Sequence, residues 1–531
     1  MRLLPRGRGG ALLRAFVAAV VVIGFTAGTT AVAGLLQIKQ FVHDLNLTKP
    51  LTSTDLTPPS PGSPETLLLI GVDHRVGEGS GPGNTDTMML VRIDDSSKTI
   101  NLLSIPRDLG VNIPGVGFSK VNAAYADGGN QGATLLLQTL QQDVFPGLEV
   151  NHILIMDFQS FADLVTSLGC VYSAVDHRYY NHSLGPAVPA NNFSSIDIEP
   201  GYQKLCGDNG APNSALAFVR FRHNDSDLVR ESRQQDFLRW AKSQFTTGQL
   251  LAKQSQLEKD FAEDVQTDKQ LHTTDAVDDL FGLAFNADGS ELNSITFPTT
   301  GTVDSPTVGD YLTFSQAQAQ QAYAQFMTPT TSTPKVGHVA LGSGMVKPKG
   351  KKHAVPAFQL PDGMIADPGD GKSQAGQLGN VGLPIYYPQD IPEGFSYCFT
   401  ITANCDEGTN PTSAYDGAYP RKYTIDGPDN RQYPAYVFTL VESSGGETDM
   451  ASGQYFNVQG TTWQDPPLLR DPSLVRKVNG KKLDIYSQGG LVSTVAWHTP
   501  RGVYWIQNTL QNVIPNEQMV AMAATLAAAG R

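Results

Sequence analysis

Three apolar runs in the first part of the chain each have the pattern of a buried β-strand, and each ends in charged residues. They are residues 66–75 (TLLLIGVDHR), 85–94 (TDTMMLVRID) and 101–109 (NLLSIPRDL). Short aliphatic and β-branched runs bounded by turn residues indicate buried strands. A fourth segment, 215–235, begins apolar and then carries four arginines. The fold must therefore accommodate charged groups at the ends of buried strands.

These charges are of two kinds. Residues 73–108 and 220–233 together contain seven arginines and nine acidic residues. The guanidinium fork matches phosphate oxygens bidentately and never loses its charge. Paired carboxylates near a phosphate usually indicate a divalent cation between them. The combination predicts phosphoryl transfer.

Length and overall charge limit the possible domain organisation and the possible partners. A chain of 531 residues exceeds the size at which a single core stops growing, so we expect two folded parts and connecting segments. The formal net charge of −13 argues against a nucleic-acid partner, which would require a basic surface. The arginine-rich stretches are therefore a local exception.

The N-terminus has the pattern of a membrane anchor. Four arginines precede residue 15, and residues 15–36 form a nearly uncharged apolar run long enough to cross a bilayer as a helix. The small residues Ala31-Val32-Ala33 leave a cleavable signal peptide as the alternative. Because the run continues through Leu35 and Leu36, we favour an uncleaved anchor, with residues 1–14 in the cytosol and the rest outside.

The rest of the chain divides by composition. Residues 37–64 include a Pro/Ser/Thr-rich stretch that predicts an extended spacer. Strand and helix patterns alternate over 65–328, which predicts an α/β domain with a layered sheet. After residue 237 the pattern is mostly helical, with one short strand predicted at residues 295–297. Residues 329–383 are predicted as a linker. Residues 384–531 are predicted as a separate small α+β domain of unknown role, built on antiparallel hairpins.

The four cysteines are expected to form disulfides, because the chain is predicted to be exported. Sequence alone leaves three pairings open. The nearest-neighbour pairing joins Cys170 to Cys206 and Cys398 to Cys405, and we expect the first of these bridges. The sequence has no Cys-x-x-Cys and no Cys/His ligand spacing, which argues against structural zinc.

Spacing within the fourth segment favours one charged site. Arg220 and Arg222 are two residues apart and would share one face of an extended strand. Arg230, Arg233 and Gln234 are spaced to share one face of a helix. Asp225 or Asp227 could cap that helix, whose N-terminus would add to anion binding. Pro106 suits a strand end just before Arg107.

Each of these residues also has a simpler interpretation. Any single arginine could pair with a neighbouring carboxylate on the surface. Asp108 could brace its loop instead of acting as a base, and Lys120 or Asn122 could be loop scaffolding. The joint spacing is what favours a site.

Six motifs in fixed order carry a family resemblance. They are GVDHR, TDTMM, SIPRD, KVNAAYADGG, FVRFRH and RESRQQ. In this order they resemble the LytR-CpsA-Psr family of cell-wall glycopolymer transferases. The resemblance is strong over residues 65–239 and looser to residue 327. It also fits the predicted architecture, since members have a short cytosolic N-terminus, one membrane helix and an external catalytic domain.

The resemblance implies a phosphotransferase that moves a glycopolymer phosphate from a polyprenyl-pyrophosphate carrier onto peptidoglycan at the cytoplasmic membrane. It implies a mixed sheet between helical layers and an apolar tunnel for the isoprenoid chain. Asp73 and Asp86 match the carboxylates that hold Mg²⁺ or Mn²⁺, although the Gly-rich insert GEGSGPGN between them departs from the pattern. The catalytic candidates are Arg107, Asp108, Arg220 and Arg222, and the substrate-binding candidates are Arg75, Lys120, Arg230, Arg233 and Gln234.

Two other functions remain open. With water in place of the acceptor hydroxyl, the same site would be a polyprenyl-pyrophosphate hydrolase. A non-catalytic lipid- or glycan-binding protein is the second alternative, but it would have no need of two carboxylates beside an arginine cluster. The sequence contains no P-loop and no Gly-x-Ser-x-Gly elbow that would suggest other chemistry.

Overall fold

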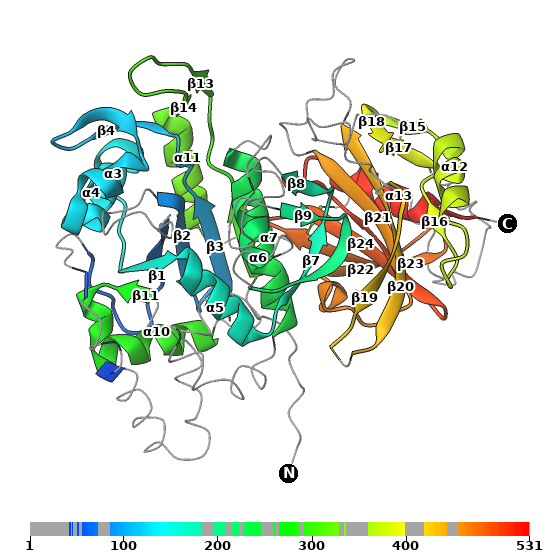
Figure 1. Cartoon of the computed structure of the whole chain (residues 1–531), viewed down its shortest axis with the longest axis horizontal. Helices are drawn as coiled ribbons and strands as arrows, with labels where there is room; N and C mark the ends of the chain where they lie inside the picture. The colour runs from blue at the N-terminus through cyan, green and yellow to red at the C-terminus, as the bar shows by residue number, and fades with distance from the viewer. Residues whose placement is uncertain are drawn as a thin grey trace, which may run out of the picture.

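The computed structural model describes most of the chain after residue 41. The described residues are 42–43, 45, 50–51, 56–72, 85–181, 196–207, 214–221, 227–245, 260, 265–286, 291–328, 334–335, 359–398, 419–428, 430–442 and 454–529. They form two units, shown in Figure 1 with the first in blue to green and the second in yellow to red.

A six-stranded mixed sheet is the centre of the first unit. Its strand order is β11-β6-β1-β2-β3-β12. The pairs β1–β2, β2–β3 and β6–β11 are antiparallel, whereas β1–β6 and β3–β12 are parallel. The mixed sheet expected from the sequence is therefore present. The strands are β1 (Glu65–Val72), β2 (Thr85–Asp94), β3 (Thr99–Ser104), β6 (His152–Asp157), β11 (Val265–Thr267) and β12 (Glu291–Ile295).

Helices cover both faces of this sheet, because alternate residues of each strand point to opposite sides. Leu68 and Ile70 of β1 pack into one hydrophobic core, and Leu67 and Leu69 pack on the other side. The first face carries α3 (Ala123–Asp127), α4 (Gly132–Thr139), η3 (Leu140–Val144) and α11 (Gln316–Met327). The second face carries α5 (Phe158–Leu168), α6 (Ala215–Arg220), α7 (Asp227–Gln244) and α10 (Thr274–Asn286).

Four short antiparallel pairings lie between the main elements of the first unit. Strands β11 to β14 fall within residues 237–327, so that part is less helical than the sequence predicts. The pairs are β4 (Gly110–Ile113) with β5 (Gly117–Lys120), β7 (Val171–Val175) with β10 (Gly201–Leu205), β8 (Tyr179–Asn181) with β9 (Ile196–Ile198), and β13 (Gly301–Val303) with β14 (Tyr311–Thr313).

The expected disulfide joins Cys170 to Cys206. It links the end of α5 to the segment before α6, across a sequence separation of 36 residues. Closing a loop of that length removes unfolded-state entropy that corresponds to about 4 kcal/mol. Cys398 is also in a disulfide, while Cys405, its predicted partner, lies outside the described residues.

An eight-stranded antiparallel sheet forms the second unit, in the order β18-β20-β21-β25-β24-β23-β22 with β19 also paired to β20. Helix α13 (Asn516–Thr525) packs on it around a second core. The strands are β18 (Phe395–Tyr397), β19 (Arg421–Asp426), β20 (Gln432–Glu442), β21 (Tyr455–Thr461), β22 (Leu474–Val478), β23 (Lys481–Gln488), β24 (Leu491–Thr499) and β25 (Gly502–Gln507).

The second unit begins earlier than the predicted boundary at residue 384. Strand β15 (Met364–Ala366) and helix α12 (Pro368–Leu378) fall inside the predicted 329–383 linker. Ala375 and Leu378 of α12 are buried in the second core. The composition of this helix, PGDGKSQAGQL, has few apolar residues and resembles a loop. Its start signals are Asp367, which caps the helix, and the proline that follows it.

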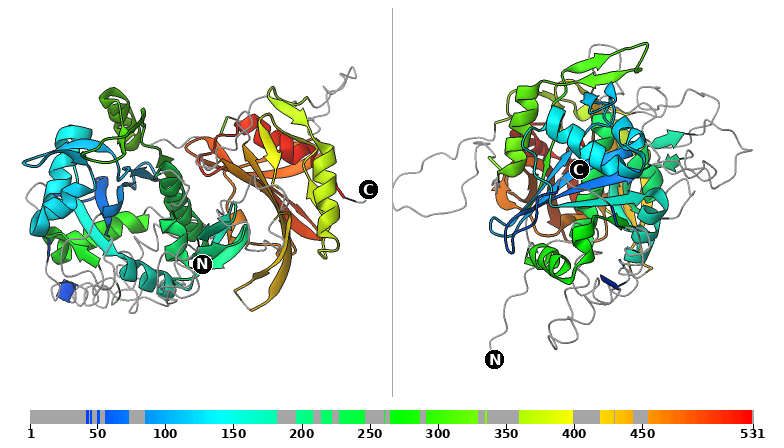
Figure 2. Two further views of the ribbon diagram at one scale, coloured as in Figure 1. Left: turned by 45° about the horizontal axis from the view of Figure 1, so that its top comes forward. Right: turned by 90° about the vertical axis from the view of Figure 1, so that its left-hand side faces the viewer.

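The separate C-terminal domain that the sequence predicts is present, and it also shares a hydrophobic core with the first unit. Tyr202 of β10 lies in one cluster with Trp463 and Trp505 of the second unit. The Tyr202 backbone N–H donates to the Tyr423 hydroxyl at 2.8 Å, and the Asn457 amide donates to the Val175 carbonyl at 3.0 Å. Figure 2 shows the second sheet beside the β7–β10 part of the first unit. The contact therefore joins the two units through a packed core and not only through the connecting chain.

In the part of the chain that the structure describes, no helix is long and apolar enough to cross a membrane. The predicted anchor at residues 15–36 lies outside that part.

Candidate active site

Several strands of the first sheet begin or end at the same end of the sheet. Strand β1 ends at Val72, and β2, antiparallel to it, begins at Thr85. Strand β3 ends at Ser104 on the same side, and the parallel strand β6 ends there at Asp157. The strand ends that the sequence marks as charged are therefore brought together by the sheet topology.

A charged cluster lies where β2 begins and β3 ends. Arg107 forms an ion pair with Asp86 through one terminal nitrogen, and its Nε lies 3.7 Å from Asp108 Oδ2. Lys120 Nζ lies 3.1 Å from Asp108 Oδ1. All four side chains are mostly buried, with exposed fractions between 10% and 24%, so water screens their charges less than it screens surface pairs.

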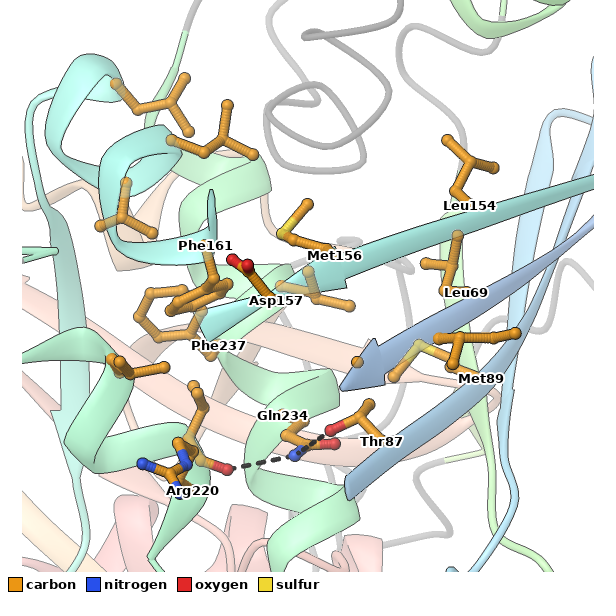
Figure 3. A pocket seen from close by; sticks show the side chains of 18 residues that line it. Leu69, Thr87, Met89, Leu154, Met156, Asp157, Phe161, Arg220, Gln234 and Phe237 are labelled. Carbon is orange, nitrogen blue, oxygen red and sulfur yellow. Dashed lines mark hydrogen bonds between the residues drawn. The ribbon is translucent and has the colours of Figure 1, made fainter. Parts of the chain in front are cut away.

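An apolar cavity lies on the face of the sheet that α5, α6 and α7 cover. It encloses about 960 Å³ of empty space including its open mouth. Its walls come from alternate residues of three strands and from the helices above them, as Figure 3 shows. They include Leu69, Met89, Leu154, Met156, Phe161, Leu164, Leu168, Val219, Phe237 and Leu238.

The cavity has one polar region, formed by Arg220 and Gln234. The Gln234 side-chain amide donates to the Thr87 hydroxyl at 2.9 Å and to the Val219 carbonyl at 3.1 Å. Thr87 follows Asp86 by one residue, so this polar region and the charged cluster lie at the same end of β2. Asp157 also lines the cavity, where its carboxylate caps α5 by accepting from the Ser160 N–H at 2.9 Å.

Arg220 reaches this position from a helix and not from the expected strand. Residues 215–219 are all buried, so their apolar pattern has no period that separates a helix from a strand. The local signal is Ser214, whose side chain accepts from the Ala217 N–H at 3.0 Å and caps α6. Arg220 is the last residue of α6.

The predicted ligands on helix α7 point in different directions. Gln234 faces the cavity, and Arg230 lies four residues earlier on the same side, almost fully buried. Arg233 is 0% exposed, and its guanidinium lies 4.4 Å from the centre of the Tyr179 ring. It donates to the Phe221 carbonyl at 2.7 Å. We therefore place Arg233 in the packing of α6 against α7 and not among the substrate contacts.

Four of the predicted residues cannot be placed. Asp73, Arg75, Arg222 and Asp225 lie outside the described residues, as does the side chain of Asp227. Asn122 braces the loop, as one of its two interpretations expects. Its backbone N–H donates to the Arg107 carbonyl at 3.2 Å.

Of the two carboxylates predicted to hold a metal, Asp86 is the one within the described residues, and its position fits a magnesium ion. Within the described residues, no group of three or more His, Cys, Asp or Glu side chains is placed to hold a metal. Mg²⁺ at phosphate sites, however, typically takes one or two carboxylates and completes its shell with phosphate oxygens and water. One mostly buried carboxylate beside an arginine matches that mode of binding.

Sequence reasoning missed Thr87 and the individual cavity walls. Thr87 lies within the TDTMM motif but has no charge to mark it. The walls do have a signal, because the apolar residues of β1 and β2 continue on both faces of the sheet. That pattern shows burial on both sides but does not distinguish a filled core from a cavity.

A model described as the LytR_cpsA_psr family matches residues 37–327. The teichoic acid transferase TagT of Bacillus subtilis is 32% identical over 175 residues, which cover 33% of this chain and 50% of TagT. The transferase TagU of Oceanobacillus iheyensis is 30% identical over 39% of this chain and 59% of its own. The probable cell wall biosynthesis protein LcpB of Corynebacterium glutamicum is 32% identical over 40% and 50%. The chain thus spans about half the length of these relatives.

Solved structures of similar proteins were also found. TagT bound to LI-WTA has 24% sequence identity and a TM-score of 0.39, covering 53% of this chain and 99% of that one. A LytR-Csp2A-Psr enzyme from Actinomyces oris has 19% identity and a TM-score of 0.39, covering 53% and 98%.

Proposed function

Because the chain belongs to the LytR-CpsA-Psr family, we propose that it is a phosphotransferase that joins a glycopolymer to peptidoglycan. The donor is the polymer linked to a polyprenyl-pyrophosphate carrier, and the acceptor is a peptidoglycan hydroxyl. Relatives named polyisoprenyl-teichoic acid–peptidoglycan teichoic acid transferases support this choice of donor and acceptor classes.

One observation carries the proposal: the apolar cavity and the charged cluster lie at the same end of the sheet. An isoprenoid tail gains free energy from apolar walls, whereas a pyrophosphate needs charged and hydrogen-bonding groups. Arg220 and Gln234 line the cavity, and Gln234 donates to Thr87. Thr87 follows Asp86, which pairs with Arg107. The site thus has a place for each half of an amphipathic donor.

The chemistry exchanges one phosphorus–oxygen bond for another. The acceptor oxygen attacks the phosphorus attached to the glycan, the bond to the bridging oxygen breaks, and polyprenyl phosphate leaves. A loose phosphoryl transition state needs mainly positioning and charge stabilisation. Arg107 and Arg220 supply that charge.

Asp108 is the proposed general base for the acceptor proton. Its two carboxylate oxygens face Lys120 and Arg107, which fix its orientation. Its position next to Arg107 supports this role, because a base must lie within reach of the proton it removes.

Mg²⁺ is the proposed metal, held by Asp86 together with Asp73. When bound, it would supply positive charge to offset that of the pyrophosphate oxygens. Asp86 also fixes the Arg107 guanidinium through their ion pair.

The proposed location is the outer face of the cytoplasmic membrane, with residues 15–36 as the anchor. This rests on the apolar run and the arginines before it. A site outside the membrane faces both the lipid-linked donor and the wall.

The experiment is a transfer assay with the purified full chain, a long-tailed polyprenyl-pyrophosphate glycan and peptidoglycan. Covalent glycan on the wall and one polyprenyl phosphate per transfer are expected. Donor cleavage that never labels the wall would show a hydrolase. Donor binding without cleavage would show a tether.

A further inference from the structure

Two hairpins form one wall next to the charged cluster. They are β4–β5 and β13–β14, and both stand at one end of the first unit in Figure 1. A bridge pairs Leu109 with Leu312, and the Leu312 N–H donates to the Asp108 carbonyl at 2.8 Å. The wall is therefore attached directly to the backbone of the proposed base.

An aromatic pair, one ring exposed and the other half-buried, lies on this wall. The rings of Phe118 and Tyr311 meet edge to face with their centres 5.0 Å apart. Phe118 is 46% exposed, although large apolar side chains are usually buried. Val116 and Val303 are exposed on the same two hairpins. Single exposed apolar residues need no explanation, but such a group on a site wall suggests a binding surface.

The backbone is shaped to hold this pair together. Gly110 lies under both rings, and a Cβ added there would come within 2.5 Å of the Tyr311 ring and 2.9 Å of the Phe118 ring. Any larger residue would push the rings apart. The close approach thus depends on a glycine two residues after Asp108.

The pair is also aligned with the site. Phe118 and Lys120 are two residues apart in β5, so they lie on the same face of the strand. Lys120 Nζ lies 3.1 Å from Asp108. A ligand resting on Phe118 would extend along this face toward the proposed base.

We propose that Phe118 and Tyr311 form the platform that binds the glycan of the acceptor. A sugar ring has a face of C–H groups, which packs on the negative face of an aromatic ring. The proposal rests on the proposed function, since it places the acceptor of that reaction. To that function the platform adds a binding position for the acceptor glycan and the two residues that hold it.

Charge favours a glycan over the membrane surface as the occupant. Asp304 and Asp310 are exposed within the 301–313 segment that carries Tyr311. Anionic lipid head groups would repel these carboxylates. An uncharged sugar ring meets no such penalty.

The test compares Phe118→Ala and Tyr311→Ala with the wild-type full chain, using a soluble, uncross-linked peptidoglycan glycan strand as acceptor. We expect the acceptor KM to rise about three- to tenfold in each variant, as loss of an aromatic contact implies. The share of cleaved donor that reaches the acceptor should fall at low acceptor concentration. Tyr311→Phe should retain most of the acceptor affinity, since it keeps the ring. Leu491→Ala is the matched control, because Leu491 is 50% exposed on the second unit.

Direct binding separates this proposal from the proposed function. Saturation-transfer NMR of the glycan strand with wild-type protein, without donor, should show contact that both alanine variants weaken. That result stands even if the protein transfers nothing. An unchanged acceptor KM and unchanged NMR contact in both variants would overturn the platform. So would weaker binding of both variants to anionic vesicles with no change in acceptor affinity, which would assign the patch to the membrane.

Discussion

The side-chain amide of Gln234 donates a hydrogen bond to the hydroxyl of Thr87 at 2.9 Å. This bond connects helix α7 to strand β2 one residue from Asp86. The same amide donates to the Val219 carbonyl, next to Arg220. One side chain thus fixes the polar part of the cavity to the sheet.

Replacing this amide tests whether the connection matters for activity. Gln234→Ala should lower kcat/KM for transfer about five- to thirtyfold, because it removes buried hydrogen bonds in the site. Gln235→Ala is the control, since Gln235 bonds to Ser104 at 2.9 Å outside the cavity. It should lower the free energy of unfolding and leave kcat nearly unchanged. Equal kinetic losses in both variants would indicate a general effect on α7.

Removing either arginine of the site should nearly abolish transfer. Arg107→Ala and Arg220→Ala each delete a charged donor, and losses of one transition-state donor are typically about 100- to 1000-fold in kcat. Circular dichroism should show an unchanged fold. Arg470→Ala removes a surface pair with Asp465 and should keep full activity. Wild-type rates in a well-folded double variant would rule out this assignment.

Transfer should also depend on Mg²⁺ or Mn²⁺. Asp86→Asn replaces a charged oxygen ligand with a neutral one, so the metal concentration for half-maximal activity should rise. A metal titration of both proteins measures this shift, with Asp94→Asn as a control at the other end of β2. Full wild-type activity in excess chelator would contradict a metal role.

A buried carboxyl distant from the site should make stability depend on pH. Burial raises the pKa of Glu65 to about 7, although the neighbouring His152 lowers it. The unfolded chain releases this proton near pH 4.5, so between pH 4.5 and 7 the folded state binds more protons. Stability should therefore fall as pH rises through this window, by up to about 3 kcal/mol.

Urea unfolding of the wild type and Glu65→Gln at pH 5 and pH 8 checks this expectation. The glutamine variant should lose less stability between the two values, because it has no proton to release. Glu149→Gln, at an exposed position, should behave like the wild type. Parallel loss in all three proteins would remove Glu65 as the cause.

The strand ends were predictable because local pattern determines them. Apolar runs followed by charged residues place Asp86 and Arg107 at one edge as soon as the strands pair, and the pairing follows from the turn at residues 95–98. The bridge between Cys170 and Cys206 was chosen from three pairings by proximity alone. The structure contains the pairing that sequence proximity predicts.

The fourth segment shows where local pattern is insufficient. The run before Arg220 is buried on every side, so tertiary packing and not periodicity decides that it is a helix. Arg233 and Gln234 differ by about 100° around α7. Which of them meets the cavity depends on how the helix is rotated, and here Arg233 packs on the Tyr179 ring while Gln234 lines the cavity. The shared core of the two units likewise depends on surfaces far apart in sequence.

Donor binding as a function of tail length tests the central claim most directly. If the cavity holds the isoprenoid chain and Arg220 holds the pyrophosphate, affinity should fall as isoprene units are removed, since each buried methylene contributes about 0.8 kcal/mol. Calorimetry with long-tailed, short-tailed and tail-less glycan pyrophosphates should give Kd values that rise steeply in that order. Equal Kd values for all three would show that the cavity does not bind the tail.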